Sequence, residues 1–144
     1  MLLNDLQKIS QLLELKSLTV CVIPRAKANY LKSQLLFKST IGNVVNKINS
    51  LYNGIDYITR YINTKTTHFK RPIPNYNNDG REPYPGITND TCEISSEVRG
   101  KDILLIDDLY TKTVNIDEDA IQALLNNGAN SVTFYSIGRT VYDR

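Results

Sequence analysis

The apolar run inside the segment KDILLIDD (residues 101–108) most strongly constrains the fold. A continuous apolar run of this kind is typical of a strand that is buried on both faces of a parallel sheet. The next segment, NIDEDAIQALLNNGA (115–129), predicts a helix, because it has acids in its first turn, apolar residues at helical spacing and Gly128 as a stop. SVTFYSIG (131–138) predicts another strand. Strand, helix and strand in so short a span predict a right-handed βαβ unit and an open, mostly parallel α/β sheet.

The N-terminal part of the chain fits the same fold class. Leucines at helical spacing predict an amphipathic helix over residues 1–16, and LTVCVIP (18–24) predicts the first core strand. Residues 25–52 begin as a basic loop and continue with apolar residues at three-to-four spacing, which predicts a helix with Gly54 as its cap. IDYITRYIN (55–63) alternates, as a second strand would.

One segment has no periodicity. Residues 69–90 are dense in Pro, Asn, Asp and Gly, so we expect a long loop, which is either a lid over a functional site or a disordered stretch. CEIS (92–95) predicts a short strand after it. The chain of 144 residues is long enough for one core, so we expect a single domain over 1–144, with helices flanking the sheet.

Composition excludes several classes of protein. The net charge is +2 and the lysines are scattered, so a nucleic-acid surface is not expected. No window approaches the ~18 apolar residues of a membrane span, and the N-terminus lacks the pattern of a signal peptide, so we expect a cytoplasmic protein. Cys21 lies among aliphatic residues, which favours buried free thiols over a Cys21–Cys92 disulfide. The lone histidine, His68, is more typical of a surface residue than of a metal ligand.

Asp107 and Asp108 follow the apolar run, where a parallel strand ends and open α/β folds bind ligands. Adjacent carboxylates repel each other, so a ligand or metal explains them better than packing, although a turn cap with a solvated partner is the simpler alternative. A Walker B reading fails because the chain has no G-x-x-x-x-G-K-[ST] loop. A receiver domain is excluded as well. Its paired acids follow the first strand and most of the domain comes after them, whereas only about a quarter of this chain follows Asp108.

The order of strand, Asp-Asp, short Thr-containing loop and helix resembles the PRPP-binding motif of type I phosphoribosyltransferases. The surrounding residues are most similar to the ComF group, amidophosphoribosyltransferase-like proteins associated with DNA uptake. The resemblance covers roughly residues 20–140. It is strong over the last third, where VRGKDILLIDD (98–108) leads into the motif, and weak before it, where ITRYINTKTTH (58–68) lies. It implies that Asp107 and Asp108 bind the ribose hydroxyls. It also implies that the loop Thr111, Lys112, Thr113, Val114 and Asn115 binds the 5-phosphate at a helix N-terminus.

The resemblance extends to a second loop. VIPRAKANYL (22–31) follows the first strand, where the family has its pyrophosphate loop, so Arg25, Ala26 and Lys27 become candidate contacts to the diphosphate. Mg²⁺ would be held mainly through PRPP, and no direct protein ligand is predicted. Residues 69–90 occupy the place of the family's active-site loop, which adds candidate contacts from Lys70, Arg71 and Arg81.

The chain departs from the family at two positions. The family loop has a glycine where this chain has Thr113. Glycine suits that position because the backbone must approach the phosphate closely there. Purine-salvage members have an aspartate at the position of Thr111, and threonine cannot assist proton transfer as that aspartate does. A purine acceptor is therefore disfavoured. Tyr110, Tyr135 and Tyr142 are either base-stacking residues or ordinary packing residues.

The resemblance thus implies a phosphoribosyltransferase, a pentosyl-transferring glycosyltransferase that binds PRPP-Mg and transfers the phosphoribosyl group to a nitrogen nucleophile. The alternative is a non-catalytic module that senses PRPP or a nucleotide, or serves as an interaction surface in DNA uptake, a mobile element or defence. A protein partner in a DNA-processing or defence system fits that alternative. Many type I members are homodimers, so a homodimer is also expected. The acceptor substrate and the pathway are not predicted.

Overall fold

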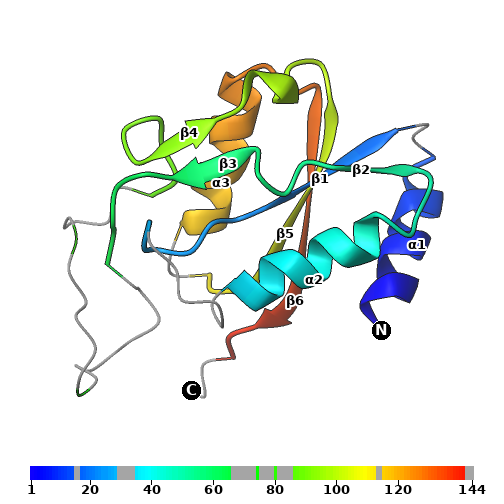
Figure 1. Cartoon of the computed structure of the whole chain (residues 1–144), viewed down its shortest axis with the longest axis horizontal. Helices are drawn as coiled ribbons and strands as arrows, with labels where there is room; N and C mark the ends of the chain where they lie inside the picture. Colours follow the sequence, from blue (N-terminus) through cyan, green and yellow to red (C-terminus); the bar gives the residue numbers. More distant parts are fainter. Residues whose placement is uncertain are drawn as a thin grey trace.

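The central sheet is parallel throughout. In this computed structural model the strands β1 (Leu18–Val22), β2 (Leu51–Asn53), β5 (Asp102–Tyr110) and β6 (Ser131–Arg139) form one sheet in the order β2-β1-β5-β6 (Figure 1). The α/β class and the mostly parallel sheet predicted from the sequence are confirmed. The structure describes the following residues: 1–14, 17–28, 35–65, 74, 80, 86–112 and 115–141.

The two central strands are β1 and β5, and both are apolar for the reason the sequence indicated. They pair from Thr19 opposite Ile103 to Val22 opposite Ile106. All of β1 is buried, and β5 is buried over its aliphatic run. A strand in the middle of a sheet that is covered on both faces has no solvent-exposed side, so both of its faces must be apolar.

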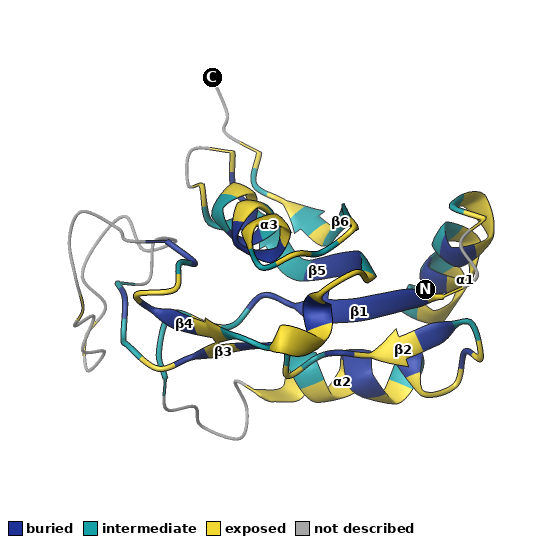
Figure 2. Ribbon diagram, turned by 90° about the horizontal axis from the view of Figure 1, so that it is seen from above, coloured by how far each residue is buried: buried dark blue, intermediate teal, exposed yellow. Residues whose placement is uncertain are grey.

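Helices cover the two faces of the sheet separately (Figure 2). The helices α1 (Leu2–Leu12) and α2 (Leu36–Val45) contribute to one core, with Leu104 and Ile106 of β5. The helix α3 (Ile116–Asn126) packs on the opposite face, over Ile103 and Leu105. Because side chains alternate along a strand, β5 supplies both cores from successive residues.

The predicted helix over residues 25–52 is wrong at its C-terminal end. It stops at Val45, and Leu51–Asn53 form the edge strand β2 instead. Leu51 fits a helical spacing, but its burial comes from pairing β2 beside Leu18 of β1. Gly54 is therefore not a helix cap; it follows β2, and its N–H donates to the carbonyl oxygen of Val20 at 2.9 Å.

The predicted strand over residues 55–63 is shorter than expected and lies outside the central sheet. Only Ile58–Arg60 (β3) is a strand, and it pairs antiparallel with β4 (Cys92–Ile94), which confirms the short strand predicted at 92–95. A short 3-10 helix, Ser96–Val98, then leads to β5. This two-stranded ribbon packs on the α3 face, because Ile58 and Cys92 belong to the same core as Leu124.

The remaining predictions can be followed where the structure describes the chain. The predicted N-terminal helix, 1–16, ends at Leu12, and Glu14 has a positive φ of 51°. α3 ends before Gly128, as predicted. Of residues 69–90, those described (74, 80 and 86–90) contain no helix or strand, and the rest lie outside the described residues. Both cysteines are buried free thiols, as predicted. Within the described ranges, no helix is long and apolar enough to cross a membrane.

The strand order places a topological switch point between β1 and β5. From β1 the chain crosses through α2 to β2 on one side, and from β5 it crosses through α3 to β6 on the other side. The two helices lie on opposite faces of the sheet (Figure 2). Open α/β sheets bind ligands at this point.

Candidate functional site

The candidate site lies at the carboxyl ends of β1 and β5. The last backbone link between these strands is the Ile23 N–H, which donates to the carbonyl oxygen of Ile106 at 3.0 Å. Beyond it the chain leaves the sheet at Pro24, while β5 continues past the end of β1. The Arg25 guanidinium then forms an ion pair with the Asp108 carboxylate at 2.8 Å. The structure therefore brings together one residue of the predicted pyrophosphate loop and one of the two acids predicted to bind the ribose.

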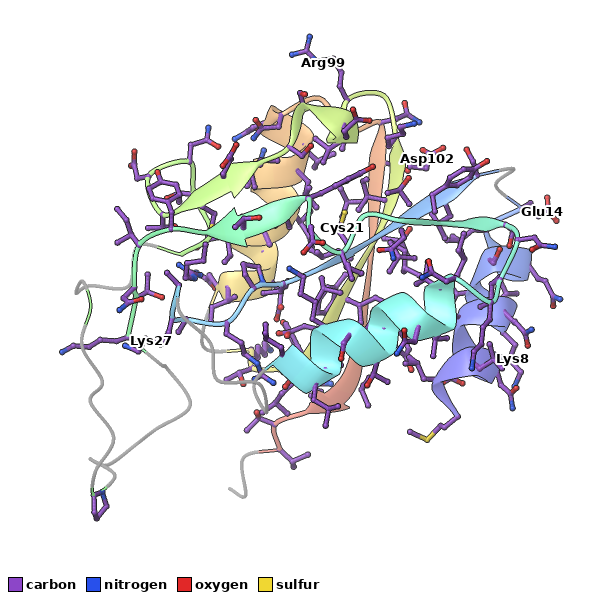
Figure 3. All side chains as sticks on the ribbon, viewed as in Figure 1. Lys8, Glu14, Cys21, Lys27, Arg99 and Asp102 are labelled. Atoms are coloured by element: carbon purple, nitrogen blue, oxygen red, sulfur yellow. The ribbon has the colours of Figure 1, made fainter. Side chains whose placement is uncertain are left out.

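The loop after β1 is held by the segment that follows β3. The Thr64 N–H donates to the carbonyl oxygen of Ala26 at 2.7 Å, and the Lys27 ammonium donates to the carbonyl oxygen of Thr64 at 3.0 Å. The Ala28 N–H donates to the side-chain oxygen of Asn63 at 2.8 Å. Figure 3 shows Lys27 at the edge of the molecule, beyond the end of β1. Residues 25–28 of the predicted pyrophosphate loop are thus held by hydrogen bonds, and Ala26 takes part through its carbonyl oxygen, which accepts from Thr64.

Arg60 of β3 also holds this loop, through a hydrogen bond from its side chain to the loop backbone. Its side chain is only 5% exposed, and its Nε–H donates to the carbonyl oxygen of Arg25 at 2.6 Å. Its Nη1 is buried and has no hydrogen-bond partner in the part of the chain that the structure describes. A guanidinium keeps its charge in proteins, so this is a fixed buried cation beneath the loop. Burial raises the pKa of the Cys92 thiol, and the charge of Arg60 opposes that rise.

Asp107 and Asp108 point to opposite faces of the sheet. Alternation along β5 places Asp107 on the α3 side, with Leu105, and Asp108 on the α2 side. Asp107 therefore meets α3 and forms a side-chain hydrogen bond with Asp117 of its first turn. One Asp107 oxygen, Oδ1, also accepts from the Asp108 N–H at 2.8 Å. The adjacent acids have different surroundings: Asp108 has a cation, and Asp107 has a second acid.

The Asp107–Asp117 pair is strongly perturbed. Burial raises the pKa of Asp107 to about 8, and the charges of Asp117 and Asp108 add to the rise. Burial also raises the pKa of Asp117 to about 6; the hydrogen bond with Asp107 opposes that rise, and the charges of Glu118 and Asp108 add to it. Asp117 is 2% exposed, and its Oδ1 is a buried atom without a hydrogen-bond partner in the described part of the chain. Two carboxyl groups in hydrogen-bonding contact need a proton between them, so both shifts have the direction that the geometry requires.

The predicted phosphate loop is partly engaged with the protein itself. The Thr111 hydroxyl is buried and lies 2.9 Å from the Thr140 hydroxyl. Asn115 precedes α3, and its carbonyl oxygen accepts from the Asp119 N–H at 2.9 Å, while its side chain makes no capping hydrogen bond. Lys112 lies between them, and Thr113 and Val114 lie outside the described residues.

The N-terminus of α3 combines amide donors with acidic side chains. The first N–H groups of a helix lack intrahelical acceptors and favour an anion. Asp117, Glu118 and Asp119 already place negative charge there. Glu118 accepts a hydrogen bond from the Tyr110 hydroxyl at 3.1 Å, and Tyr110 also packs against the Phe134 ring, so its contacts are structural. A bound phosphate would have to share this helix terminus with three carboxylates.

Other candidate residues are distant or not described. Lys70, Arg71, Arg81, His68 and Tyr142 lie outside the described residues. The Tyr135 hydroxyl donates to Asp5 of α1 at 2.8 Å, which gives it a structural role. Across the described ranges, no three His, Cys, Asp or Glu side chains are grouped so that they would hold a metal ion.

Sequence reasoning missed Asp117 and Arg60. The sequence pattern presents Asp117 only as one of the acids that favour a helix start, yet this side chain is hydrogen-bonded to Asp107 of β5. Arg60 is not among the predicted site residues, although it lies in the 58–68 segment. A signal existed for Arg60: alternation from the buried Ile58 through the exposed Thr59 places the charge on the inward face.

Comparisons of the chain with known proteins find no matching family model and no significant match among curated proteins.

Proposed function

We propose that this chain is a phosphoribosyltransferase-like protein that binds PRPP with Mg²⁺ at the switch point between β1 and β5. One observation carries the proposal: the 2.8 Å contact between Arg25 and Asp108. It joins the loop proposed for the diphosphate to the acids proposed for the ribose. A cation for phosphate and a carboxylate for hydroxyls, side by side at the ligand-binding edge of an open sheet, suit a sugar phosphate.

In the catalytic form of this proposal, a nitrogen nucleophile displaces pyrophosphate from PRPP. The bond from the ribose anomeric carbon to the diphosphate oxygen breaks, and a bond from that carbon to nitrogen forms. Asp107 and Asp108 hold the ribose hydroxyls, while Arg25 and Lys27 stabilise the charge on the leaving group. Mg²⁺, held through PRPP, would add positive charge at the diphosphate. Positioning and charge supply most of the rate, because no group of the protein forms a covalent bond.

The test is calorimetric titration of the whole chain with PRPP and Mg²⁺. We expect Asp108→Asn to weaken binding at least about tenfold, because it removes the charge that accepts from the hydroxyls and orients Arg25. Asp56→Asn is the matched control. It makes the same chemical change at an exposed carboxylate that forms an ion pair with Lys38 at 2.6 Å. Equal affinities for wild type and Asp108→Asn would contradict the assignment of the ribose site.

A second candidate is a non-catalytic module that binds PRPP or a nucleotide as a sensor or interaction surface. Two observations favour it: the acids at the start of α3, which repel a phosphate, and the engagement of Thr111 with Thr140. Screening nitrogen nucleophiles for pyrophosphate release separates the candidates. Turnover would establish the enzyme, and binding without turnover would favour the sensor, with a protein partner in DNA processing or defence and a homodimer as its proposed assemblies.

A further inference from the structure

The carboxyl group of Asp117 is the feature of this site with the least structural justification. It is 2% exposed, one of its oxygens has no hydrogen-bond partner among the described residues, and its side chain is hydrogen-bonded to another acid, Asp107. Burying a polar group without partners costs free energy, and burying two carboxylates against each other costs more. An apolar residue at this helix position would avoid both costs, so packing alone does not account for Asp117.

The surroundings leave the pair with few ways to neutralise its charge. Asp108 on the same strand adds negative charge, and Glu118 adds more from α3. The cation Arg25, from the loop after β1, is directed at Asp108. The charge of Arg139, from β6, opposes the rise in the pKa of Tyr110, whose hydroxyl donates to Glu118. A proton held between Asp107 and Asp117 is therefore the direct way to relieve their repulsion.

We propose that Asp117 is a positioning residue that shares one proton with Asp107 and takes that proton when Asp107 binds the vicinal diol of a ribose. This role rests on the proposed function and names a residue that neither loop motif includes. A carboxylate accepts hydrogen bonds from two hydroxyls with both oxygens, whereas a carboxylic acid uses one oxygen as a donor. Asp117 thus lets Asp107 present its charged form to the diol without leaving two charges in contact.

The proton balance is simple. In the free protein one proton lies in the hydrogen bond between the two carboxyl groups. When the diol donates to Asp107, this proton stays in the pair but is bonded to an Asp117 oxygen, from which it donates to Asp107. No proton needs to enter or leave, and binding is strongest over the pH range in which the pair holds one proton.

The first part of the test uses the free protein. Carbon-13 NMR of aspartate-labelled wild type should show two coupled carboxyl groups, one of which titrates well above the ordinary range near pH 4. In Asp117→Asn the side-chain amide donates permanently, so we expect Asp107 to titrate at lower pH than in wild type. Carboxyl groups that both titrate near pH 4, each unchanged by substitution of the other, would overturn the proposal whatever the ligand result.

The second part measures the affinity for PRPP and Mg²⁺ between pH 7 and about 9.5. Once the pair loses its proton, wild-type affinity should fall by about tenfold per pH unit, and Asp117→Asn should keep its affinity, because its amide proton is not lost. Asp117→Ala, which removes both the second charge and the donor, should also lose the pH dependence of wild type but bind more weakly than Asp117→Asn. A merely structural role would instead lower the affinities of both variants by factors independent of pH, and that result would overturn the proposal.

The two parts distinguish the possible failures. A shared titration in the free protein with no PRPP binding at any pH would overturn the proposed function and the diol-binding role of the pair together. PRPP binding with a pH profile unaffected by Asp117→Asn would leave the proposed function standing and overturn the role of Asp117.

Discussion

Arg60 carries charge in a place where β3 otherwise buries apolar surface. Its Nε–H donates to the Arg25 carbonyl oxygen, and its Nη1 has no partner within the residues described. The free energy of burying such a group is unfavourable, because the interior does not replace its hydration. We infer that Arg60 is retained for the loop it supports and contributes little to the stability of the fold.

This inference predicts that stability and loop order separate in Arg60→Met. Methionine keeps the apolar stem and removes the charge, so the free energy of unfolding should stay within about 1 kcal/mol of wild type in urea titrations. Hydrogen exchange of the Ala28 and Thr64 amides, which belong to the loop contacts, should become faster.

Arg60→Lys is the control for that experiment, since it restores a charge without the Nε–H that holds the loop. It should therefore show the faster exchange as well. Unchanged exchange in both variants, or a loss of several kcal/mol in Arg60→Met, would show that Arg60 is a structural residue of β3.

At the scale of elements, the entry into β5 depends on a residue without a side chain. Gly100 has a φ of +70° and its N–H donates to the Gly128 carbonyl oxygen at 2.8 Å, so it ties the start of β5 to the end of α3. A Cβ placed at Gly100 would meet no atom within 4 Å. The requirement for glycine is therefore conformational and not steric.

We expect Gly100→Ala to lower the free energy of unfolding by about 1 kcal/mol, because alanine is strained at this positive φ. Gly100→Asn should lose less, since asparagine tolerates the left-handed region better. Urea titration of the three proteins measures both effects. Equal stabilities of the glycine and alanine forms would mean that the turn adapts at no cost.

Local sequence patterns predict the elements better than they predict the element boundaries. β5 and α3 have strong patterns, and both occur close to their predicted places. Leu51 fits the helical spacing of the preceding residues equally well, yet it belongs to the edge strand β2. A three-residue strand is too short to display an alternation of its own, so only its pairing with β1 identifies it.

For the whole molecule, the Asp107–Asp117 pair predicts how stability depends on pH. Both pKa values are raised in the folded state, to about 8 and about 6, from the ordinary value of 3.8. Between about pH 4 and about pH 8 the unfolded chain therefore binds fewer protons than the folded one. The stabilisation from this pair is complete below about pH 4 and is lost as pH rises through about 8.

Thermal unfolding of wild type and Asp117→Asn between pH 5 and 9 measures this dependence. We expect the difference in melting temperature to shift in favour of Asp117→Asn as pH rises, because the variant has one acid fewer to deprotonate at the contact. Asp56→Asn, which alters an exposed carboxylate, should follow the wild-type curve. Parallel curves for all three proteins would show that the pair titrates alike in the folded and unfolded states.

The sequence by itself determined the fold class, the order of the main elements and the two acids after the aliphatic run of β5, although the strand continues past them to Tyr110. Hydrophobic periodicity and turn residues act over a few positions, and these features depend on nothing more distant. Only the tertiary structure decided the partners of Asp107, Asp108 and Arg25. Those contacts join β1, β3, β5 and α3, and they depend on the strand order and on which face of the sheet each helix covers. A local pattern cannot encode the meeting of residues that lie far apart along the chain.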